Sequence, residues 1–451
     1  MSEDPGRGTL ARLEDVAGDR VYPLETAERV GGTRLRARVE PKDGEELAAC
    51  LEVFSSRREP ALVMGAGTRM ELGNPVRGVS IALSCRRLNG IIEFDPADGV
   101  IQVLAGTPLA DLACAVEAEG WLLPLDPPDR GGTVGGVLAT AACGPRQRGF
   151  GSVRDAVLGI DTAMASGVRT RCGARVVKNV TGYDLAKLYV GSLGTLAVIE
   201  KAWLRLKPLP ASTRVVEVEM LEAQDAFALA IAATRRSSAR AVALVGEGVG
   251  VDVDGDVGMD EGAGVGQDPG EGAGPREAGC EASDRWRLVA EFAGEEPATE
   301  ADAAWLSAGR GGSGRGDASV DAVRALQGRR SPEGLKARIH MVPGALAMVC
   351  ARLRAGGARV LAYPEPGVVH ANFGPGDARE NPGSWLEGTL GLLDEIRAAA
   401  AAELVIEALP PDTGTHRDVF SGAPGLSVMR SIKQRFDPDG ILNPGRFAGR
   451  I

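Results

Sequence analysis

The glycine-rich stretch between residues 130 and 207 constrains this chain more than any other feature. Residues 131–136 read Gly-Gly-Thr-Val-Gly-Gly, residues 149–159 read Gly-Phe-Gly-Ser-Val-Arg-Asp-Ala-Val-Leu-Gly, and residues 178–185 read Lys-Asn-Val-Thr-Gly-Tyr-Asp-Leu. Glycine tolerates positive φ and has no Cβ, so glycines at this density between apolar runs bring the backbone close to another group. The stretch predicts a large anionic ligand that is held mainly by backbone.

Charge is unevenly distributed along the 451 residues. The net charge is −10 and no basic stripe is present, which argues against a nucleic-acid partner. Residues 251–283 hold nine acidic residues, one basic residue and nine glycines. Such a segment cannot bury enough apolar surface to become ordered, so we expect a disordered acidic insertion at about residues 249–283. Its Asp252, Asp254 and Asp256 alternate as in a calcium loop, but the glycine and glutamate that such a loop requires are missing, so we expect no calcium site.

Cysteine and histidine usage excludes several kinds of redox and metal site. The seven cysteines include no Cys-x-x-Cys pair, which fits reduced thiols and argues against an iron–sulfur cluster in this chain. The three histidines, at positions 340, 370 and 416, are far apart in sequence, so we expect no metal site. No secretory signal and no apolar run of about 18 residues are present, which predicts a cytoplasmic protein without a transmembrane segment.

Apolar periodicity indicates two α+β units rather than a strict βαβ alternation. Residues 1–36 are polar and predict a peripheral segment, and the Lys-Pro-Leu-Pro run at 207–210 predicts a domain boundary. Asp43 and Thr107 are expected to cap helices. Strands are expected at 61–64, 79–84, 91–94, 100–104, 157–163 and 196–206, and in the second unit at 240–246, 285–292, 336–342, 358–362, 367–373 and 403–408. Helices in the second unit are expected near 222–235, 343–355 and 385–402.

Two glycine loops are candidate anion sites. Residues 65–68, Gly-Ala-Gly-Thr, follow an apolar strand directly and can present successive N–H groups to a phosphate. Residues 131–136 open an expected helix in the same way. Each loop alone could equally be a tight turn that allows close packing, but two in one domain suit a pyrophosphate reached from both sides. Neither loop has the full dinucleotide fingerprint, and no Walker A motif is present.

Four segments carry a resemblance to a known family. They are residues 151–159, residues 177–185, residues 189–196 (Tyr-Val-Gly-Ser-Leu-Gly-Thr-Leu) and residues 436–447 (Phe-Asp-Pro-Asp-Gly-Ile-Leu-Asn-Pro-Gly-Arg-Phe). The chain resembles the FAD-binding domain of the vanillyl-alcohol oxidase and p-cresol methylhydroxylase (PCMH-type) superfamily, and within it the FAD-binding subunits of glycolate oxidases. The resemblance covers about residues 39–210 and 428–447, and leaves the middle of the chain uncovered.

The resemblance implies an α+β fold with a two-subdomain PCMH-type FAD-binding domain over residues 37–210. An α+β cap domain with an antiparallel sheet would follow over 211–410, and a tail over 411–451 would return to the FAD domain. The pyrophosphate would lie on the two glycine loops and the adenine along the strand at 198–199. The residues given these cofactor-binding roles are Gly65, Ala66, Gly67, Thr68, Thr133, Val134, Gly135, Gly136, Val198 and Ile199.

Non-covalent FAD is the expected cofactor. Many relatives attach their flavin through histidine, but this chain has no histidine before residue 340. Cys143 lies near the second glycine loop and could form a thioether, although a small buried side chain is the more common role for such a cysteine. We therefore expect denaturation to release the flavin.

Oxidation of a 2-hydroxy acid requires a cation for the carboxylate and a base for the hydroxyl proton. His370 is a candidate base, although a lone histidine on a strand is more often structural. The same argument applies to His340. Arg446 is a candidate for contact with the flavin or an anion, although its Asn-Pro-Gly turn could simply anchor the tail. His416 falls in an expected loop, and the sequence identifies no further catalytic residue.

The resemblance implies an FAD-dependent oxidoreductase acting on CH–OH groups, as one subunit of a glycolate oxidase-type complex. Its partners would be a larger flavin subunit and an iron–sulfur subunit, its substrate a small 2-hydroxy acid, and any contact with the inner membrane face would be made through those partners. Two alternatives stay open: a non-catalytic flavin-binding or assembly subunit, and a standalone oxidase or dehydrogenase of a D-2-hydroxy acid.

Overall fold

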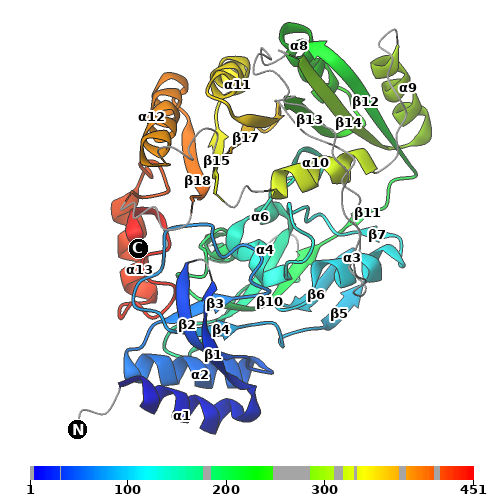
Figure 1. Cartoon of the computed structure of the whole chain (residues 1–451). Coiled ribbons are helices and arrows are strands. Elements are labelled where there is room, and N and C mark those ends of the chain that lie inside the picture. Colours follow the sequence, from blue (N-terminus) through cyan, green and yellow to red (C-terminus); the bar gives the residue numbers. More distant parts are fainter. Residues whose placement is uncertain are drawn as a thin grey trace, which may run out of the picture.

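The computed structural model describes residues 5–30, 32–175, 184–246, 285–308, 318–329, 333–374, 382–410 and 417–451. The acidic insertion with its three alternating aspartates, His416 and residues 178–183 of the third glycine motif lie outside the described residues. The chain forms two α+β units, with the cap unit above the N-terminal unit in Figure 1.

The first subdomain is a four-stranded sheet with two helices on it. Its order is β1 (Val21–Val30), β2 (Thr33–Val39), β4 (Ile81–Ser84) and β3 (Ala61–Met64), and the helices are α1 (Pro5–Ala17) and α2 (Gly44–Arg57). Asp43 caps α2 as predicted, because its carboxylate accepts from the N–H groups of Glu45 and Glu46. In the described part of residues 1–36, Leu13 and Ala17, one turn apart on α1, are completely buried against this subdomain.

The second subdomain is a five-stranded antiparallel sheet. Its order is β5 (Ile91–Asp95), β6 (Val100–Leu104), β10 (Val198–Arg205), β8 (Val157–Ala163) and β9 (Arg169–Gly173). The helices of this subdomain are α3 (Leu109–Glu117), α4 (Val134–Thr140), α5 (Gln147–Phe150), α6 (Val153–Ala156) and α7 (Ala186–Tyr189). Thr107 does not cap α3. Its hydroxyl instead accepts from the N–H of Gly90 at 3.0 Å, and Pro108 takes the N-cap position without a side-chain bond.

The cap domain is a seven-stranded antiparallel sheet that β7 (Trp121–Leu122) and β11 (Lys207–Pro208) precede at the boundary. The order is β12 (Ser212–Glu222), β14 (Arg285–Gly294), β13 (Ala239–Gly246), β16 (Arg359–Tyr363), β17 (Val368–Phe373), β15 (Leu335–His340) and β18 (Glu403–Ala408). Its helices are α8 (Ala223–Thr234), α9 (Glu296–Ser307), α10 (Ala318–Gly328), α11 (Leu346–Ala355) and α12 (Pro382–Ala400).

The cap strands alternate between two faces of different character. On β15, Leu335, Ala337 and Ile339 are buried in the core that also includes residues of α8, α11 and α12. Because neighbouring side chains of a strand point to opposite faces, Lys336 and Arg338 lie on the other face. That second face carries charged side chains, among them Arg338 and Glu407, which line a pocket together with residues 140–143 of the FAD-binding unit.

The C-terminal segment returns to the first subdomain. It contains α13 (Leu426–Phe436) and a short 3-10 turn, Ala448–Arg450. The N–H of Ala61 donates to the carbonyl of Ile441 at 2.8 Å, and the N–H of Val63 donates to Asn443 Oδ1 at 2.8 Å. The tail therefore extends the backbone pairing of β3, the strand that leads into the first glycine loop.

Candidate functional site

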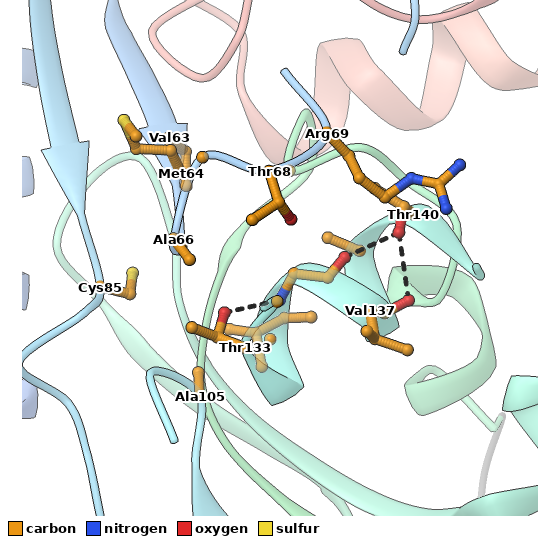
Figure 2. Close-up of a pocket in the computed structure, with 18 of the residues that line it drawn as sticks. Val63, Met64, Ala66, Thr68, Arg69, Cys85, Ala105, Thr133, Val137 and Thr140 are labelled. Carbon is orange, nitrogen blue, oxygen red and sulfur yellow. Dashed lines mark hydrogen bonds between the residues drawn. The ribbon is translucent and has the colours of Figure 1, made fainter. Parts of the chain in front are cut away.

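A pocket between the two glycine loops, here called the cradle, is the centre of the N-terminal unit (Figure 2). Its space, including the mouth that opens to solvent, is about 820 Å³. The end of β3, the start of α4 and β10 form its walls. Nine of the ten predicted cofactor-binding residues line it; the tenth, Val134, is completely buried and lies outside the lining.

The first glycine loop offers unused donors. Among the residues that the structure describes, none accepts from the N–H groups of residues 65–68. Gly67 has φ of +83°, a conformation that glycine adopts without strain. Successive unpaired N–H groups in such a loop form a concave site for an anion, as the sequence predicts.

In the second glycine loop, most N–H groups are already bonded within the protein. The N–H of Val134 donates to the carbonyl of Thr107 at 3.0 Å, and that of Gly135 to the carbonyl of Ala105 at 2.7 Å. The N–H of Gly136 donates to Thr133 Oγ1 at 3.3 Å. The N–H of Gly131 donates to Asp129 Oδ1 at 2.8 Å, so within residues 131–136 only the N–H groups of Gly132 and Thr133 have no acceptor among the described residues.

The two loops are in direct contact. A Cβ on Gly65 would lie 2.3 Å from Thr133 Oγ1, and a Cβ on Gly135 would lie 2.7 Å from that of Ala105. Any side chain at either glycine would force the loops or the neighbouring strand to move. The glycines therefore keep the cradle narrow while leaving its first wall rich in N–H groups.

Arg446, from the C-terminal segment, is a buried cation of the cradle. The residue is 5% exposed and its Nη2 donates to the carbonyl of Met70 at 3.0 Å. Burial lowers its pKa to about 10. No carboxylate of the described residues forms an ion pair with it, and a buried cation of this kind favours an anion nearby. Unused N–H groups, a narrow glycine-lined gap and an unpaired cation fit the pyrophosphate of a dinucleotide.

Comparison with known proteins agrees with this geometry. Residues 35–173 match the family described as FAD binding domain, and residues 419–447 match the C-terminal domain of FAD linked oxidases. The crystal structure of p-cresol methylhydroxylase with substrate bound superimposes with a TM-score of 0.69 at 16% identity, over 99% of this chain and 97% of that one. Residues 35–173 are thus an FAD binding domain, and the chain has the same fold as p-cresol methylhydroxylase. The predicted α+β fold class and FAD as cofactor are thereby confirmed.

Curated relatives match this chain over part of their length. Glycolate oxidase subunit GlcE of Escherichia coli K12 is 38% identical over 177 residues, 38% of this chain and 50% of that protein. The D-lactate dehydrogenase of Anaerostipes hadrus is 34% identical over 194 residues, 43% of this chain and 41% of the enzyme. Glycolate oxidase subunit GlcD of Bacillus subtilis 168 is 32% identical over 180 residues, 40% of this chain and 38% of that subunit. The matches thus span half or less of each relative.

A second pocket, here called the chamber, adjoins the cradle. It lies between the end of α4 and the charged face of the cap sheet, with residues of β15, β17 and β18 in its wall. Arg69 and Thr140 line both pockets, so the chamber begins where the cradle ends. A ligand extended along the cradle would therefore reach the chamber with its far end.

Glu407 on β18 is the centre of charge in the chamber. Its carboxylate lies 3.2 Å from Arg338 Nε and 3.3 Å from Lys336 Nζ. Arg69 Nη2 is 3.9 Å away and His370 Nδ1 is 3.8 Å away. Three basic side chains and a histidine thus surround one carboxylate, which leaves the chamber with an excess of positive charge.

Burial and charge fix the protonation states in the chamber. Burial alone would raise the pKa of Glu407, but the His370 contact and the neighbouring cations hold it well below its usual value. Burial lowers the pKa of Lys336, and Glu407 opposes that shift. Burial also lowers the pKa of His370, which keeps the imidazole neutral near pH 7.

Several buried polar atoms around the chamber have no hydrogen-bond partner within the described residues. They are Arg69 Nη1, Arg338 Nε, His370 Nδ1 and Asn372 Oδ1, of which Arg338 Nε has the ion pair with Glu407. Buried polar groups are nearly always paired, so this concentration points to a polar ligand. Arg69 Nη1 and Arg338 Nε are donors, Asn372 Oδ1 is an acceptor, and His370 Nδ1 is either one according to the tautomer of the ring.

The structure separates the two predicted catalytic candidates. His370 lies in the chamber, whereas Arg446 lines the cradle. His340 is at the chamber rim, where its Nε2 lies 3.1 Å from the carbonyl of Pro366. Cys143 lines the chamber and is half-buried, and burial raises its pKa, so it is a neutral thiol near pH 7.

Sequence reasoning missed Arg69, Arg338 and Glu407 in the chamber wall, and also Lys336, which contacts Glu407 from outside the lining. A signal was present, because charged residues recur at every second position of strands whose other positions are apolar. Within the described residues no cluster of histidine, cysteine and acidic side chains has the composition of a metal site. In that same part of the chain no helix has the length and apolarity needed to cross a membrane.

Proposed function

We propose that this chain is an FAD-dependent oxidoreductase acting on the CH–OH group of glycolate or a related 2-hydroxy acid, as one subunit of a glycolate oxidase-type complex. The observation that carries the proposal is the position of the chamber, a buried pocket with excess positive charge at the end of the FAD cradle. Similarity to glycolate oxidase subunits and a D-lactate dehydrogenase supports the same reaction class.

The carboxylate of the substrate would bind to the two guanidinium groups of the chamber. Arg69 Nη1 is buried without a partner in the described structure, and Arg338 has one carboxylate contact. Guanidinium–carboxylate contacts are charge-assisted and directional, so two of them fix the orientation of a small acid. Glu407 keeps the cations in place without neutralising all of them.

His370 would take the hydroxyl proton at Nδ1. Its lowered pKa leaves the ring unprotonated and able to accept at neutral pH. The Glu407 carboxylate, 3.8 Å away, would stabilise the imidazolium that forms. FAD, when bound, supplies the acceptor for the hydride that leaves the substrate carbon. The predicted cradle residues and Arg446 would hold the cofactor, with its adenine beside Val198 and Ile199.

Electrons would leave through partner proteins. The sequence has no closely spaced cysteines for an iron–sulfur cluster, and related chains are named as subunits of glycolate oxidase. We therefore propose a larger flavin subunit and an iron–sulfur subunit as partners. A cytoplasmic location, with contact to the inner membrane face through those partners, follows from the same proposal.

Anaerobic mixing of the purified holo-protein with glycolate or D-lactate tests the proposal. Loss of the yellow flavin band without partners would show independent catalysis, and loss only with both partners would show a catalytic subunit that depends on the complex. A yellow protein that never bleaches, alone or with partners, would contradict catalysis and indicate an assembly role. A colourless protein that takes up no FAD would contradict the proposal at its base.

A further inference from the structure

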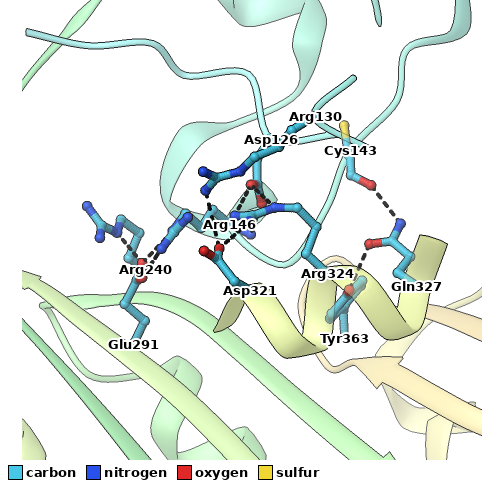
Figure 3. Close-up of polar contacts among 10 residues, drawn as sticks. All are labelled: Asp126, Arg130, Cys143, Arg146, Arg240, Glu291, Asp321, Arg324, Gln327 and Tyr363. Atoms are coloured by element: carbon cyan, nitrogen blue, oxygen red, sulfur yellow. Dashed lines mark hydrogen bonds and ion pairs between the residues drawn. The ribbon is translucent and has the colours of Figure 1, made fainter. Parts of the chain in front are cut away.

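Helix α10 crosses the boundary between the cap sheet and the FAD-binding unit (Figure 3). Arg324 donates to Asp126 Oδ1 from Nε at 2.9 Å and from Nη2 at 2.6 Å, and both side chains are almost completely buried. The other carboxylate oxygen of Asp126 accepts from the backbone N–H of Arg146 at 2.8 Å. This ion pair attaches the middle of α10 to the FAD-binding unit.

Gln327, one turn further along α10, forms hydrogen bonds to both the FAD-binding unit and the cap sheet. Its Nε2 donates to the carbonyl of Cys143 at 2.8 Å, just beyond α4, and its Oε1 accepts from the hydroxyl of Tyr363 on β16 at 2.8 Å. The residue is 3% exposed. Both ends of the amide are used, and a flipped amide would set two acceptors against each other at Cys143. Gln327 therefore has one orientation that joins the two units.

The backbone of Gln327 also contacts the chamber. Its carbonyl accepts from Lys336 Nζ, which in turn forms the ion pair with Glu407 at 3.3 Å. Carbonyls in the last turn of a helix lack helical partners and carry the negative end of the helix dipole. This carbonyl therefore stabilises the Lys336 ammonium at a place where burial disfavours it.

We propose that Gln327 is a positioning residue that holds the Lys336 ammonium beside Glu407 at the chamber wall, where its positive charge favours binding of the substrate anion. The inference rests on the proposed function of the chamber. The side chain of Gln327 fixes the end of α10 against Cys143 and Tyr363, and the fixed carbonyl then holds Lys336. Gln327 does not line the cradle but does line the chamber, whereas Lys336 contacts Glu407 from outside the chamber lining, so the coupling between the two residues decides whether Gln327 acts through Lys336.

The experiment measures binding of oxalate, a carboxylate anion that is not a hydroxy acid, to the holo-protein by the change in flavin absorbance. Gln327→Met keeps the size of the side chain and removes its hydrogen bonds. We expect about fivefold to tenfold weaker oxalate binding, because roughly 1 kcal/mol accompanies such a loss. FAD affinity should stay within about twofold, and Ala325→Ser, an exposed change on the same helix, should have no effect.

A double-mutant cycle separates positioning from general destabilisation. Lys336→Met should weaken oxalate binding more than Gln327→Met, and Gln327→Met should add almost nothing to it. The pH dependence gives a second readout. Oxalate binding requires the ammonium and is lost as pH rises through the Lys336 pKa, so Gln327→Met should move that loss to lower pH.

The charged or titratable groups facing this region are Glu407 from β18, His370 from β17, Tyr363 from β16, Arg338 from β15 and Arg69 from the first loop.

Two outcomes overturn the inference while leaving the proposed function intact: unchanged oxalate affinity in Gln327→Met, or full additivity with Lys336→Met. Failure of the wild-type protein to bind oxalate, together with failure to be reduced by hydroxy acids, is failure of the proposed function. In that case the inference is decided by urea unfolding. The Gln327→Met and Lys336→Met changes must then lower the urea midpoint less than additively, and additive lowering would contradict the contact.

Discussion

The cradle and the chamber adjoin each other but are built from different parts of the polypeptide. The cradle is made of backbone: its first loop presents N–H groups, its glycines set its width, and Arg446 is its one cation without an ion-pair partner among the described residues. The chamber is lined by side chains of four cap strands, β15 to β18, and by residues of the FAD-binding unit, with cations around Glu407. Substitutions should therefore act on cofactor affinity in the first pocket and on substrate chemistry in the second.

The difference also explains why one region resembles its relatives and the other does not. The FAD-binding match covers residues 35–173, which include both glycine loops, whereas no family match covers the cap strands. Backbone sites tolerate few changes because any Cβ closes the gap between the loops. A side-chain site on a stable sheet can exchange its charged residues while the core face keeps the sheet folded.

The His370→Asn substitution should give the largest effect and tests whether the chamber performs chemistry. Removal of a general base typically costs 10² to 10⁴ in rate, so we expect a fall in kcat of about 10³. In the wild type, activity should rise with pH through the lowered pKa of His370 and be level above about pH 6.5. Stopped-flow reduction of the flavin at several pH values measures both. A pH-independent loss of only a few fold would assign His370 a structural role.

The Arg338→Met substitution should separate the two pockets most clearly. Loss of a charge-assisted contact to the substrate carboxylate is worth about 2 kcal/mol, so kcat/KM should fall about 30-fold. FAD affinity should be unchanged, because Arg338 lines only the chamber. Arg235→Met, the same change at an exposed position outside both pockets, is the matched control. Equal loss of FAD affinity and activity would show that the two pockets are not separable.

The Gly65→Ala substitution tests the cradle from the opposite side. The new methyl would lie 2.3 Å from Thr133 Oγ1, so the loops must separate. Overpacking of this kind costs about 1 to 3 kcal/mol, and we expect FAD binding to weaken at least about tenfold. Titration calorimetry of the apo-protein with FAD measures the change. Gly344→Ala, where nothing lies within 4 Å, is the control, and equal behaviour of the two variants would contradict the cradle.

The Cys143→Ser substitution should have the smallest effect. Cys143 is a neutral, half-buried thiol that lines the chamber and not the cradle, so we expect FAD content and activity to change less than about twofold. Flavin should be released from the wild-type protein by acid precipitation. Flavin retained in the wild-type pellet but released from the variant would show a thioether at Cys143 and contradict non-covalent binding.

The sequence predicts the cradle well because its features are local. Glycines at 65, 67 and 135 indicate from the sequence alone that the backbone approaches another group closely or adopts positive φ. The N–H partners of the second loop could not be predicted, because they are the carbonyls of Ala105 and Thr107 on a distant segment. The buried face of α1 was missed for the same reason, since α2 and the sheet that cover Leu13 come later in the chain.

Few features of the sequence predict the chamber. Arg69 and Lys336 are 267 residues apart and Lys336 and Glu407 are 71 residues apart, and the pairing of β15 with β18 brings the last two together. Alternation within residues 335–340 indicates which side chains share a face, but not which face meets the cofactor. The α10 contacts of Gln327 depend on docking of the two units and have no local signature.

Anaerobic reduction of the bound flavin by glycolate, in wild type and Arg338→Met side by side, tests the central claim most directly. The claim is that an anion held in the chamber delivers its electrons to a cofactor held in the cradle. With its partners present, the wild-type protein should lose its flavin band and Arg338→Met should do so about 30-fold less efficiently at equal FAD content. Identical behaviour of the two proteins would contradict this claim. A wild-type protein that is fully loaded with FAD and that no 2-hydroxy acid reduces would also contradict it.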